Sequence, residues 1–437
     1  MEEIKMKDSG IKWIGKIPED WDIKKVKYKA KLYTGNSIAD NEKENYEDSD
    51  FALPYIATKD INVHNHNIDY ENGMYIKKDD WSFKRAPKDS SLLCIEGGSA
   101  GKKIGYTNQP VCFVNKLCCF TSDNMDNKFL FYTLNSYSFK EAFNQNIFGL
   151  IGGVSTEKIK NIKITIPSVE EQKLIAGFLD KKCADIDEII SKTEKQIETL
   201  EQYKKSLITE TIITGNNPNA KLIKTNIKWI DKVSTEATIL RLKNYSYMKG
   251  RIGWQGLTAD EFIDEGPYCV TGTDFKNGYI DWNTSYHISE KRYQMDYNIQ
   301  LKVGDLLVTK DGTIGKLARV NYLPDKACLN SHLLIIRPLR NKFINDYLYY
   351  VMSSDIFVKY YSFESNGSTM DSLSQEKLGR FTFPAYSIEK QKVIANYLDK
   401  KCADIDEVLN KQKESLETLK KYKQSLIYEY VTGKKRV

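Results

Sequence analysis

The chain has 437 residues, of which 28% are charged and 41% hydrophobic, and 65 Lys+Arg against 59 Asp+Glu give a formal net charge of +6. This composition is typical of a globular chain and excludes a disordered one, and the length suggests about three domains. The net charge is too small to indicate by itself that the protein binds nucleic acid.

Two further classes are excluded by features that the sequence lacks. No apolar run approaches the ~18–20 residues that cross a bilayer, and residues 1–5 do not resemble a signal peptide, so we expect a cytoplasmic protein with no membrane partner. The 8 cysteines include no Cys-x-x-Cys pair. This argues against zinc ribbons and against a disulfide framework, and favours reduced thiols.

The first part of the chain predicts a mixed α/β body. Residues 7–21 form an N-terminal motif rich in Lys, Gly and Trp, and short β-type runs such as Ile162–Ile166 are separated by Gly, Asn and Asp turns. The apolar run Phe129–Leu134 is expected to be a buried helix.

A long helix is predicted next. No Pro or Gly interrupts Phe178–Ile213, and a Gly-Asn-Asn-Pro turn at 215–218 then ends the helix. Apolar side chains recur with a seven-residue period over about four heptads, which is typical of a coiled coil. The seam residues are Leu179, Ile186, Ile190, Ile197, Leu200 and Leu207.

The second half of the chain repeats the first. Residues 170–210 align with residues 389–429 at a constant offset of 219, with 25 identities in 41 positions. Residues Ile11–Ile14 of the N-terminal motif return as Ile227–Ile230, and the expected buried helix returns as Tyr347–Met352. A period this long indicates domain duplication and not a solenoid. The second helix has the seam Leu398, Ile405, Leu409, Leu416, Leu419 and Leu426.

The two helices are expected to pair antiparallel and form a rigid spacer. The alternative is that they are separate core helices of two domains, which does not explain the strict seven-residue period.

The sequence offers no catalytic, metal or cofactor site. The glycines of Gly97–Lys102 are separated by three residues where a phosphate-binding loop needs four, and Lys103 stands where that loop needs Ser or Thr. His64 and His66 lack a third ligand nearby, which favours an ordinary loop. The acids Asp185 and Asp187, with their repeats Asp404 and Asp406, are interpreted as plain surface acids.

Matching glycine-rich turns are the first candidates for DNA contact. Glycine lets the backbone approach a phosphate and lysine supplies the counter-charge. A solvated hairpin explains either turn alone, but recurrence at equivalent positions favours function. The residues are Gly98, Ser99, Lys102 and Lys103 in the first body, and Lys310, Thr313 and Lys316 in the second.

A second group has side chains of the types that contact bases. Arg can bond guanine, Gln can bond adenine, and Trp can pack on sugar or base. The first body has Asn36 where the second has Arg251, which suggests two similar modules that read different sequences. The candidates are Asn36, Lys249, Arg251, Trp254 and Gln255, with Asn115, Asn330 and His332 as weaker ones that strand-end caps explain almost as well.

The pattern resembles the specificity (S) subunit of type I restriction-modification systems. The resemblance covers almost the whole chain and rests on the N-terminal motif, on the start of each long helix (Gln172–Asp180 and its second copy), and on the duplicated glycine-rich turn. The second copy of the N-terminal motif departs from the family pattern, because Asp231–Val233 replaces Gly15–Ile17 and the later Pro and Trp are missing. That leaves the start of the second body open by several residues.

The resemblance implies an α+β fold with two α/β target recognition domains, separated by an antiparallel coiled coil of two long conserved helices and related by a pseudo-two-fold duplication. The implied segments are a first recognition domain with the N-terminal motif (1–167), a first spacer helix (168–215), a second recognition domain (216–386), and a second spacer helix with the tail (387–437).

The resemblance also implies partners. Each domain would read one half of a bipartite site in double-stranded DNA, and the coiled coil would set the spacer and dock two modification (methyltransferase) subunits. Restriction (motor-nuclease) subunits would join them. S-adenosylmethionine, ATP and magnesium would belong to these partners, whose target base would be adenine. The residues that would contact phosphates are Lys102, Lys103 and Lys316. Those that would contact base edges are Asn36, Arg251 and Gln255, and those that would contact the methyltransferase are Ser206, Glu210 and Glu429.

Two functions of other classes compete with this one. A fused methyltransferase-nuclease is disfavoured, because the chain has neither the methyltransferase motifs nor the length to contain them. A structural coiled-coil protein whose lateral domains bind protein or carbohydrate remains an alternative that DNA binding would exclude.

Overall fold

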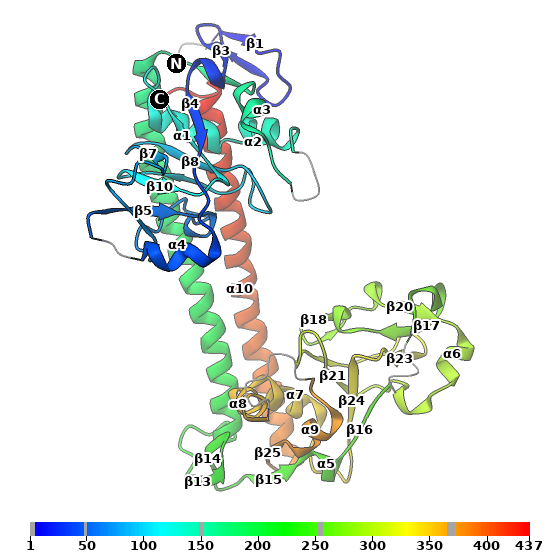
Figure 1. Ribbon diagram of the computed structural model, residues 1–437. Coiled ribbons are helices and arrows are strands. Elements are labelled where there is room, and N and C mark those ends of the chain that lie inside the picture. Colours follow the sequence, from blue (N-terminus) through cyan, green and yellow to red (C-terminus); the bar gives the residue numbers. More distant parts are fainter. Residues whose placement is uncertain (1–4, 48–49, 148–151, 252–256, 365–371) are drawn as a thin grey trace. The chain divides into compact units, whose positions relative to one another are not determined.

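The computed structural model (Figure 1) describes residues 5–47, 50–147, 152–251, 257–364 and 372–437. The chain folds as two compact units: unit 1 is Met1–Glu194 with Lys413–Val437, and unit 2 is Lys195–Gln412. Each unit contains one α/β body and one segment of each long helix. The expected fold class is confirmed. The boundary between the two compact units falls within both long helices, so the units differ from the four consecutive segments expected from the sequence. The division into those four segments stays a prediction.

Unit 1 contains twelve strands and three short helices among its described residues, besides its segments of the long helices. The strands are β1 (Met6–Asp8), β2 (Lys16–Pro18), β3 (Asp22–Lys25), β4 (Lys31–Thr34), β5 (Ala52–Ile56), β6 (Tyr75–Lys77), β7 (Arg85–Ala86), β8 (Ser91–Cys94), β9 (Ile104–Tyr106), β10 (Val111–Phe113), β11 (Leu117–Thr121) and β12 (Lys163–Ile166). The helices are α1 (Asn127–Asn135), α2 (Tyr137–Asn144) and α3 (Thr156–Lys160).

Unit 2 contains thirteen strands and five short helices among its described residues, in an order similar to that of unit 1. Its strands are β13 (Leu222–Ile227), β14 (Ile230–Ser234), β15 (Thr238–Arg241), β16 (Ser246–Gly250), β17 (Phe262–Val270), β18 (Phe275–Lys276), β19 (Tyr279–Ile280), β20 (Tyr286–Ile288), β21 (Leu306–Thr309), β22 (Leu317–Arg319), β23 (Ala327–Leu329), β24 (Leu333–Pro338) and β25 (Thr382–Ala385). Its helices are α5 (Leu242–Tyr245), α6 (Glu290–Gln294), α7 (Asn345–Ser353), α8 (Asp355–Glu364) and α9 (Gln375–Arg380).

The two bodies share one sheet topology, which supports the duplication. The sheet β4-β11-β8-β9 of unit 1 corresponds to the run β16-β24-β21-β22 of unit 2, and neighbouring strands in both are antiparallel. Strands β5 and β10 pair parallel, as do β17 and β23. The buried helices expected from the sequence are α1 and α7, and the strand expected at Ile162–Ile166 is β12.

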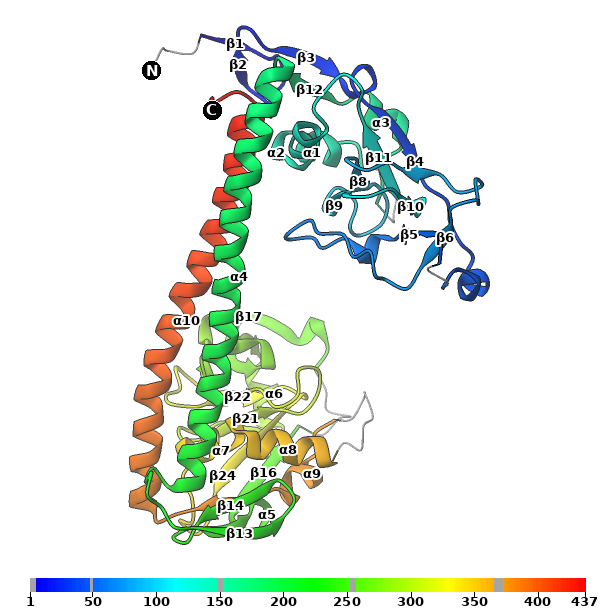
Figure 2. The ribbon, with the colours of Figure 1, turned by 90° about the vertical axis from the view of Figure 1, so that its left-hand side faces the viewer.

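The long helices are α4 (Val169–Thr214) and α10 (Ile388–Val431), and no described helix has the length and apolar character needed to span a membrane. Within each unit, a segment of α4 lies beside a segment of α10 (Figure 2). In unit 1 the segments run antiparallel, because Asp187 pairs with Lys423 and the later Glu194 pairs with the earlier Lys420.

The predicted seam residues face inward to different degrees. Leu179, Ile186, Ile190, Ile197, Leu398, Leu409 and Leu426 are buried, while Leu200, Leu207, Ile405, Leu416 and Leu419 are half-buried. In unit 1 the seam joins the main core of the body, where Ile186, Ile190 and Leu426 pack in one cluster with Trp21 and Phe129. The helices are therefore part of the core of each unit.

Ion pairs complete the seam, and they correct the interpretation of two acids. Lys423 Nζ lies 2.6 Å from both carboxylate oxygens of Asp187 in unit 1. In unit 2, Lys204 Nζ lies 2.7 and 2.6 Å from the carboxylate oxygens of Asp406. The Lys423 side chain is only 10% exposed. Asp187 and Asp406 are thus counter-charges for seam lysines, whereas Asp185 is exposed as expected.

A second duplicated contact joins each body to its helix segment. In unit 1 the Tyr132 hydroxyl donates to Asp180 Oδ1 at 2.6 Å, and Lys128 Nζ lies 3.3 Å from the same oxygen. In unit 2 the Tyr350 hydroxyl donates to Asp399 Oδ1 at 2.6 Å.

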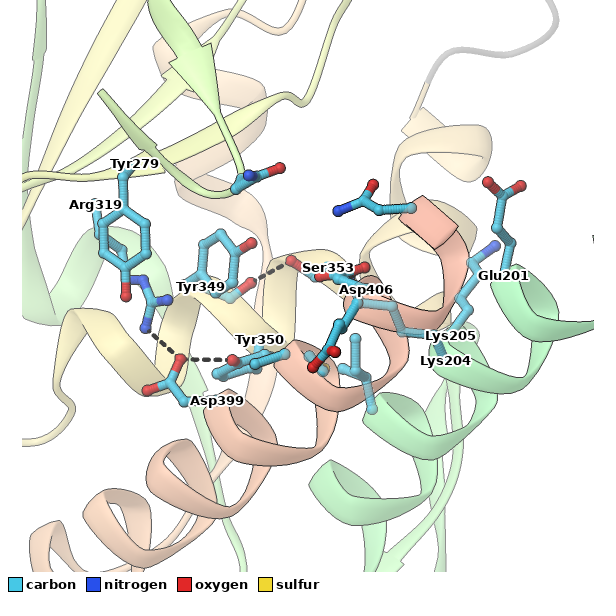
Figure 3. A pocket seen from close by; sticks show the side chains of 16 residues that line it. Glu201, Lys204, Lys205, Tyr279, Arg319, Tyr349, Tyr350, Ser353, Asp399 and Asp406 are labelled. Carbon is cyan, nitrogen blue, oxygen red and sulfur yellow. Dashed lines mark hydrogen bonds and ion pairs between the residues drawn. The ribbon is translucent and has the colours of Figure 1, made fainter. Parts of the chain in front are cut away.

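Figure 3 shows the unit 2 cluster, where Arg319 reaches Asp399 from the other side at 2.9 Å. These side chains line a cavity of about 620 Å³ between the body and the helix segments of unit 2. Since a helix aspartate accepts from a tyrosine and pairs with a cation in both units, the body has one defined orientation on its helix segments.

The start of each long helix is fixed by a buried glutamine. Gln172 donates its Nε2 to Pro167 O at 3.0 Å, and its Oε1 accepts from Asp126 N at 2.9 Å. Gln391 makes the equivalent contacts, donating to Tyr386 O at 2.7 Å and accepting from Ile344 N at 3.0 Å. Each glutamine joins its long helix to the segment that begins α1 or α7, which explains why this residue recurs in the repeated motif.

The seam ion pair generates a stability prediction. Asp187→Ala leaves a nearly buried lysine without its counter-charge, so we expect the free energy of unfolding to fall by about 2–3 kcal/mol. Asp185→Ala, two residues away and exposed, is the matched control and should change it by less than about 0.5 kcal/mol. Denaturant unfolding of the full chain measures both. Equal effects at the two positions would mean that Asp187 is a surface acid after all.

Candidate nucleic-acid interface

The candidate residues of unit 2 converge at one end of its largest sheet. The strands β16, β24, β21 and β22 lie side by side and are antiparallel. Gly250 of β16 pairs with Leu334 of β24, and Thr309 of β21 pairs with Leu333 of β24. Val308 of β21 pairs with Leu317 of β22. The carboxyl ends of β16 and β21 therefore meet the amino ends of β24 and β22. This sheet end carries Lys249, Lys310, Thr313, Lys316, Asn330 and His332.

Unit 1 repeats this arrangement. In the sheet β4-β11-β8-β9, Thr34 of β4 pairs with Cys118 of β11, and Leu117 of β11 pairs with Cys94 of β8. Leu93 of β8 pairs with Ile104 of β9. The turns at this equivalent sheet end carry Asn36, Gly98, Ser99, Lys102, Lys103 and Asn115. Candidates that are far apart in the sequence are thus brought together in each unit, at the same place in the topology.

Two glycines make the close approaches that this sheet end needs. A Cβ on Gly35 would lie 1.7 Å from the carbonyl oxygen of Phe113, so only glycine lets the chain cross there. Gly101 has φ +71°, and a Cβ would lie 2.8 Å from the Phe143 ring. The turn at 97–103 is further held by Gly97 N, which donates to Gly152 O at 2.8 Å. The backbone of this turn is therefore tightly constrained.

The lysines of the turns differ in how far they are engaged by the protein. Lys103 is half-buried, and its Nζ donates to Thr58 O at 2.8 Å, which makes it a structural side chain in this conformation. Lys102 is exposed, with its Nζ 3.2 Å from Gly98 O. Lys316 and Thr313 are exposed on the second turn. Lys102 and Lys316 are therefore the two candidate lysines of these turns whose side chains are exposed to solvent.

The remaining candidates of unit 2 form a polar cluster around the second turn. Lys310 N donates to His332 O at 2.9 Å, and His332 Nδ1 lies 3.2 Å from Asp311 Oδ2. Asn330 Oδ1 accepts from Ser331 N at 2.5 Å, which caps the start of β24. In unit 1, Asn115 is exposed before β11.

Arg251 requires a correction. The residue is only 2% exposed, and its Nε donates to Leu329 O at 3.0 Å while an Nη lies 3.4 Å from Cys328 Sγ. Its guanidinium therefore joins β16 to β23 inside unit 2 and does not reach a base edge. The other two side chains of this motif, Trp254 and Gln255, lie outside the described residues.

Asn36 is likewise engaged within the protein. Its Oδ1 accepts from Lys84 N at 2.8 Å and its Nδ2 donates to Ser82 O at 3.4 Å. Both groups of the amide that could read a base are bonded to the loop before β7. Sequence reasoning missed this loop, because its contact with Asn36 spans 48 residues.

The residues expected to face a methyltransferase lie on the long helices. Ser206 and Glu210 are exposed on α4. Glu429 is half-buried on α10, and its carboxylate lies 2.9 Å from Lys435 Nζ.

The histidine pair and the cysteines show no sign of a metal centre in the described parts of the chain. His66 Nε2 lies 2.9 Å from Asn135 Nδ2, and burial lowers the pKa of His66 to about 3, so the ring is neutral near pH 7. All eight cysteines are free and buried. Among residues 5–47, 50–147, 152–251, 257–364 and 372–437, no group of three or more His, Cys, Asp or Glu could hold a metal ion.

The duplicated units and their matching sheet ends define a protein with two similar binding faces, one in each unit. The family of the type I restriction modification DNA specificity domain matches the chain twice, at residues 18–199 and 255–418. The chain therefore belongs to the type I restriction-modification DNA specificity family, with one recognition domain in each match.

Curated relatives resemble the whole chain. The putative type I restriction enzyme MjaX specificity subunit of Methanocaldococcus jannaschii is 25% identical over 97% of this chain and 96% of its own length. The MjaVIII specificity subunit of the same organism is 26% identical over 97% of this chain and 94% of its own length. The EcoKI specificity subunit of Escherichia coli is 25% identical over 71% of this chain and 68% of its own.

A solved structure shares the fold. A chain from a study of complex assembly and conformational transition of the type I restriction-modification system superposes with a TM-score of 0.68, at 15% identity, and covers 95% of this chain and 98% of that one.

The corrected position of Arg251 generates a prediction. Arg251→Met removes a buried, charge-assisted hydrogen bond, so we expect the free energy of unfolding to fall by about 2 kcal/mol. The neighbouring Lys249→Met, on a half-buried side chain, is the control and should change it by less than about 0.5 kcal/mol. Chemical denaturation measures this. Unchanged stability at Arg251, with altered choice of bases, would restore the base-reading role.

Proposed function

We propose that this chain is the DNA specificity subunit of a type I restriction-modification complex, that each unit reads one half of a bipartite site, and that the chain catalyses no step itself. The observation that carries the proposal is the convergence of candidate residues on equivalent sheet ends of two duplicated units. Two faces with one topology and different side chains fit two half-sites of different sequence, since base choice depends on the side chains presented.

The proposed partners are double-stranded DNA, two modification (methyltransferase) subunits and restriction (motor-nuclease) subunits, assembled in the cytoplasm. In the proposal, the target base is adenine, and S-adenosylmethionine, ATP and magnesium bind to the partner subunits.

Exposed apolar residues on the long helices support the docking of two copies of one partner. Ile189 recurs as Val408 and Tyr203 as Tyr422, and all four are exposed. The same surface is thus presented twice, and Ser206, Glu210 and Glu429 extend it.

The proposal also gives the long helices a measuring role. No Pro or Gly interrupts α4 between Phe178 and Ile213 or α10 between Ile388 and Val431, so in this proposal the two helices are stiff enough to set the spacer between half-sites.

DNA binding by the assembled complex tests the function. We expect sequence-specific binding to a bipartite duplex, and methylome sequencing of a host that carries all subunits supplies the site. Lys102→Ala and Lys316→Ala should each weaken binding to all sequences and reduce the slope of log affinity against log salt by about 1. Lys192→Ala, an exposed lysine on α4, is the control. A complex with methyltransferase subunits that binds no DNA would overturn the proposal.

A change in helix length tests the measuring role. Seven residues inserted after Lys195 in α4 and after its repeat Glu414 in α10 keep the heptad period, and they lengthen each helix by about 10 Å. At 3.4 Å per base pair we expect the preferred spacer to grow by about three base pairs. Methylation of a library of spacer lengths measures it. An unchanged spacer would show that the helices do not set it.

A further inference from the structure

A rigid loop in unit 1 presents a tryptophan to solvent. Trp81 is 78% exposed, which is unusual for the largest apolar side chain, since burying such a side chain contributes about 1.5–3 kcal/mol or more. Its ring lies 3.9 Å from the Arg85 guanidinium carbon. An exposed aromatic side chain that is already held in one position loses little entropy when a ligand covers it.

Contacts with the sheet end described above hold this loop. The Tyr33 hydroxyl donates to Arg85 O at 2.7 Å, and the Asn36 amide bonds Ser82 O and Lys84 N. Phe83, two residues after Trp81, packs inward against the ring of Tyr55 at 6.2 Å. The loop therefore lies beside Asn36, at the candidate DNA-binding end of β4, and its Trp81 side chain is exposed to solvent.

The corresponding stretch of unit 2 carries different side chains and forms α6 followed by a short 3-10 helix, Tyr297–Ile299. Counting back from the repeated Leu92-Leu93 and Leu306-Leu307 pairs, Trp81 corresponds to Met295 and Phe83 to Tyr297. The Tyr247 hydroxyl of β16 donates to Asn298 O at 3.0 Å, next to Tyr297. Tyr297 is 74% exposed and Met295 is exposed as well. Each unit thus exposes apolar side chains in this stretch, and a tyrosine of the neighbouring strand β4 or β16 donates a hydrogen bond to its backbone.

The charge around the first loop fits a polyanion. Lys77, Lys78, Lys84 and Lys88 are exposed along residues 77–88. Of the two acids between them, Asp80 is engaged, because its Oδ1 accepts from Ser82 N at 2.9 Å and from Ser82 Oγ at 2.5 Å. Lysines around an exposed aromatic ring are the combination that proteins use to hold phosphates while a ring packs on sugar or base.

We propose that these two loops contact DNA, and that Trp81 and Tyr297 pack against a sugar or base of the first and second half-site respectively. Asn36 is then a positioning residue that holds the Trp81 loop and does not itself read a base. The inference rests on the proposed function and extends it to specific side chains. The stretch precedes the Leu-Leu strand (β8 or β21) in both units, while its local structure and side chains differ, as two half-sites of different sequence require.

The experiment uses the complete complex with its methyltransferase subunits and duplexes in which either half-site is scrambled. We expect Trp81→Ala to lower affinity for duplexes with an intact first half-site by about tenfold or more, with no loss of discrimination at the second. Tyr297→Ala should give the reverse pattern. Trp81→Phe keeps an aromatic ring and should recover part of the affinity. Thermal unfolding confirms that each variant is folded, as the exposure of both side chains leads us to expect.

Tyr28→Ala is the matched control. Tyr28 is 65% exposed and has the Lys27 amine 5.2 Å from its ring centre, but it precedes β4, at the opposite end of that strand from Asn36. This substitution should leave DNA affinity unchanged. Asn36→Ala should weaken first-half-site binding, and it should add little to Trp81→Ala, because both act through one loop.

The outcomes separate this inference from the proposed function. If the wild-type complex binds no DNA, the function fails and the inference fails with it. If the wild type binds its bipartite site but Trp81→Ala behaves like wild type or like Tyr28→Ala, the inference is overturned and the function stands. If Trp81→Ala reduces the number of methyltransferase subunits bound, measured by native mass spectrometry, the loop is a protein-docking surface and the inference is overturned. Additive effects of Asn36→Ala and Trp81→Ala would mean that the two residues act independently and that Asn36 itself reads a base.

Discussion

A buried amine without a counter-charge is costly, and each pair of helix segments in this protein has a lysine in its mainly apolar seam, nearly buried at Lys423 and half-buried at Lys204. Lys204 and Lys423 occupy repeated positions, and Asp406 and Asp187 are the repeated carboxylates that face them. Apolar side chains alone allow neighbouring registers of two helices, whereas a lysine that needs one particular carboxylate favours a single register. The duplication supplies both members of both pairs, so one sequence motif fixes the register in each unit.

The body of each unit is attached to this helix pair by contacts that also recur. Tyr132 and Tyr350 donate to aspartates one heptad before the ion-pair carboxylates, and Gln172 and Gln391 bond the segments that begin α1 and α7. These contacts fix where α1 lies on α4 and where α7 lies on α10 within their units. The long helices that carry the seam therefore also hold the bodies whose sheets carry the candidate DNA-binding ends.

The two recognition faces combine a common frame with different side chains. Gly35 and Gly250 let the chain pass closely at the ends of β4 and β16, and Tyr33 and Tyr247 each donate a hydrogen bond to the segment that carries Trp81 or Tyr297. The exposed residues on that frame differ, with Trp81 in one unit and Tyr297 in the other. A frame that tolerates such exchange lets base preference change without a change of fold, since exposed loop side chains contribute little to the core.

The sequence alone determined the duplication, the long helices and their apolar seam, and the two buried helices. It also showed that the glycine-rich turn recurs at equivalent positions in the two halves. These features depend on periodicity and on local residue types, which a single chain displays directly. Only the tertiary structure decided which polar side chains are available. Arg251 looks like a base reader in the sequence but bonds Leu329, 78 residues away, and Asp187 looks like a surface acid but pairs with Lys423, 236 residues away. The partner of a charged side chain depends on contacts between distant segments, and local sequence does not record those contacts.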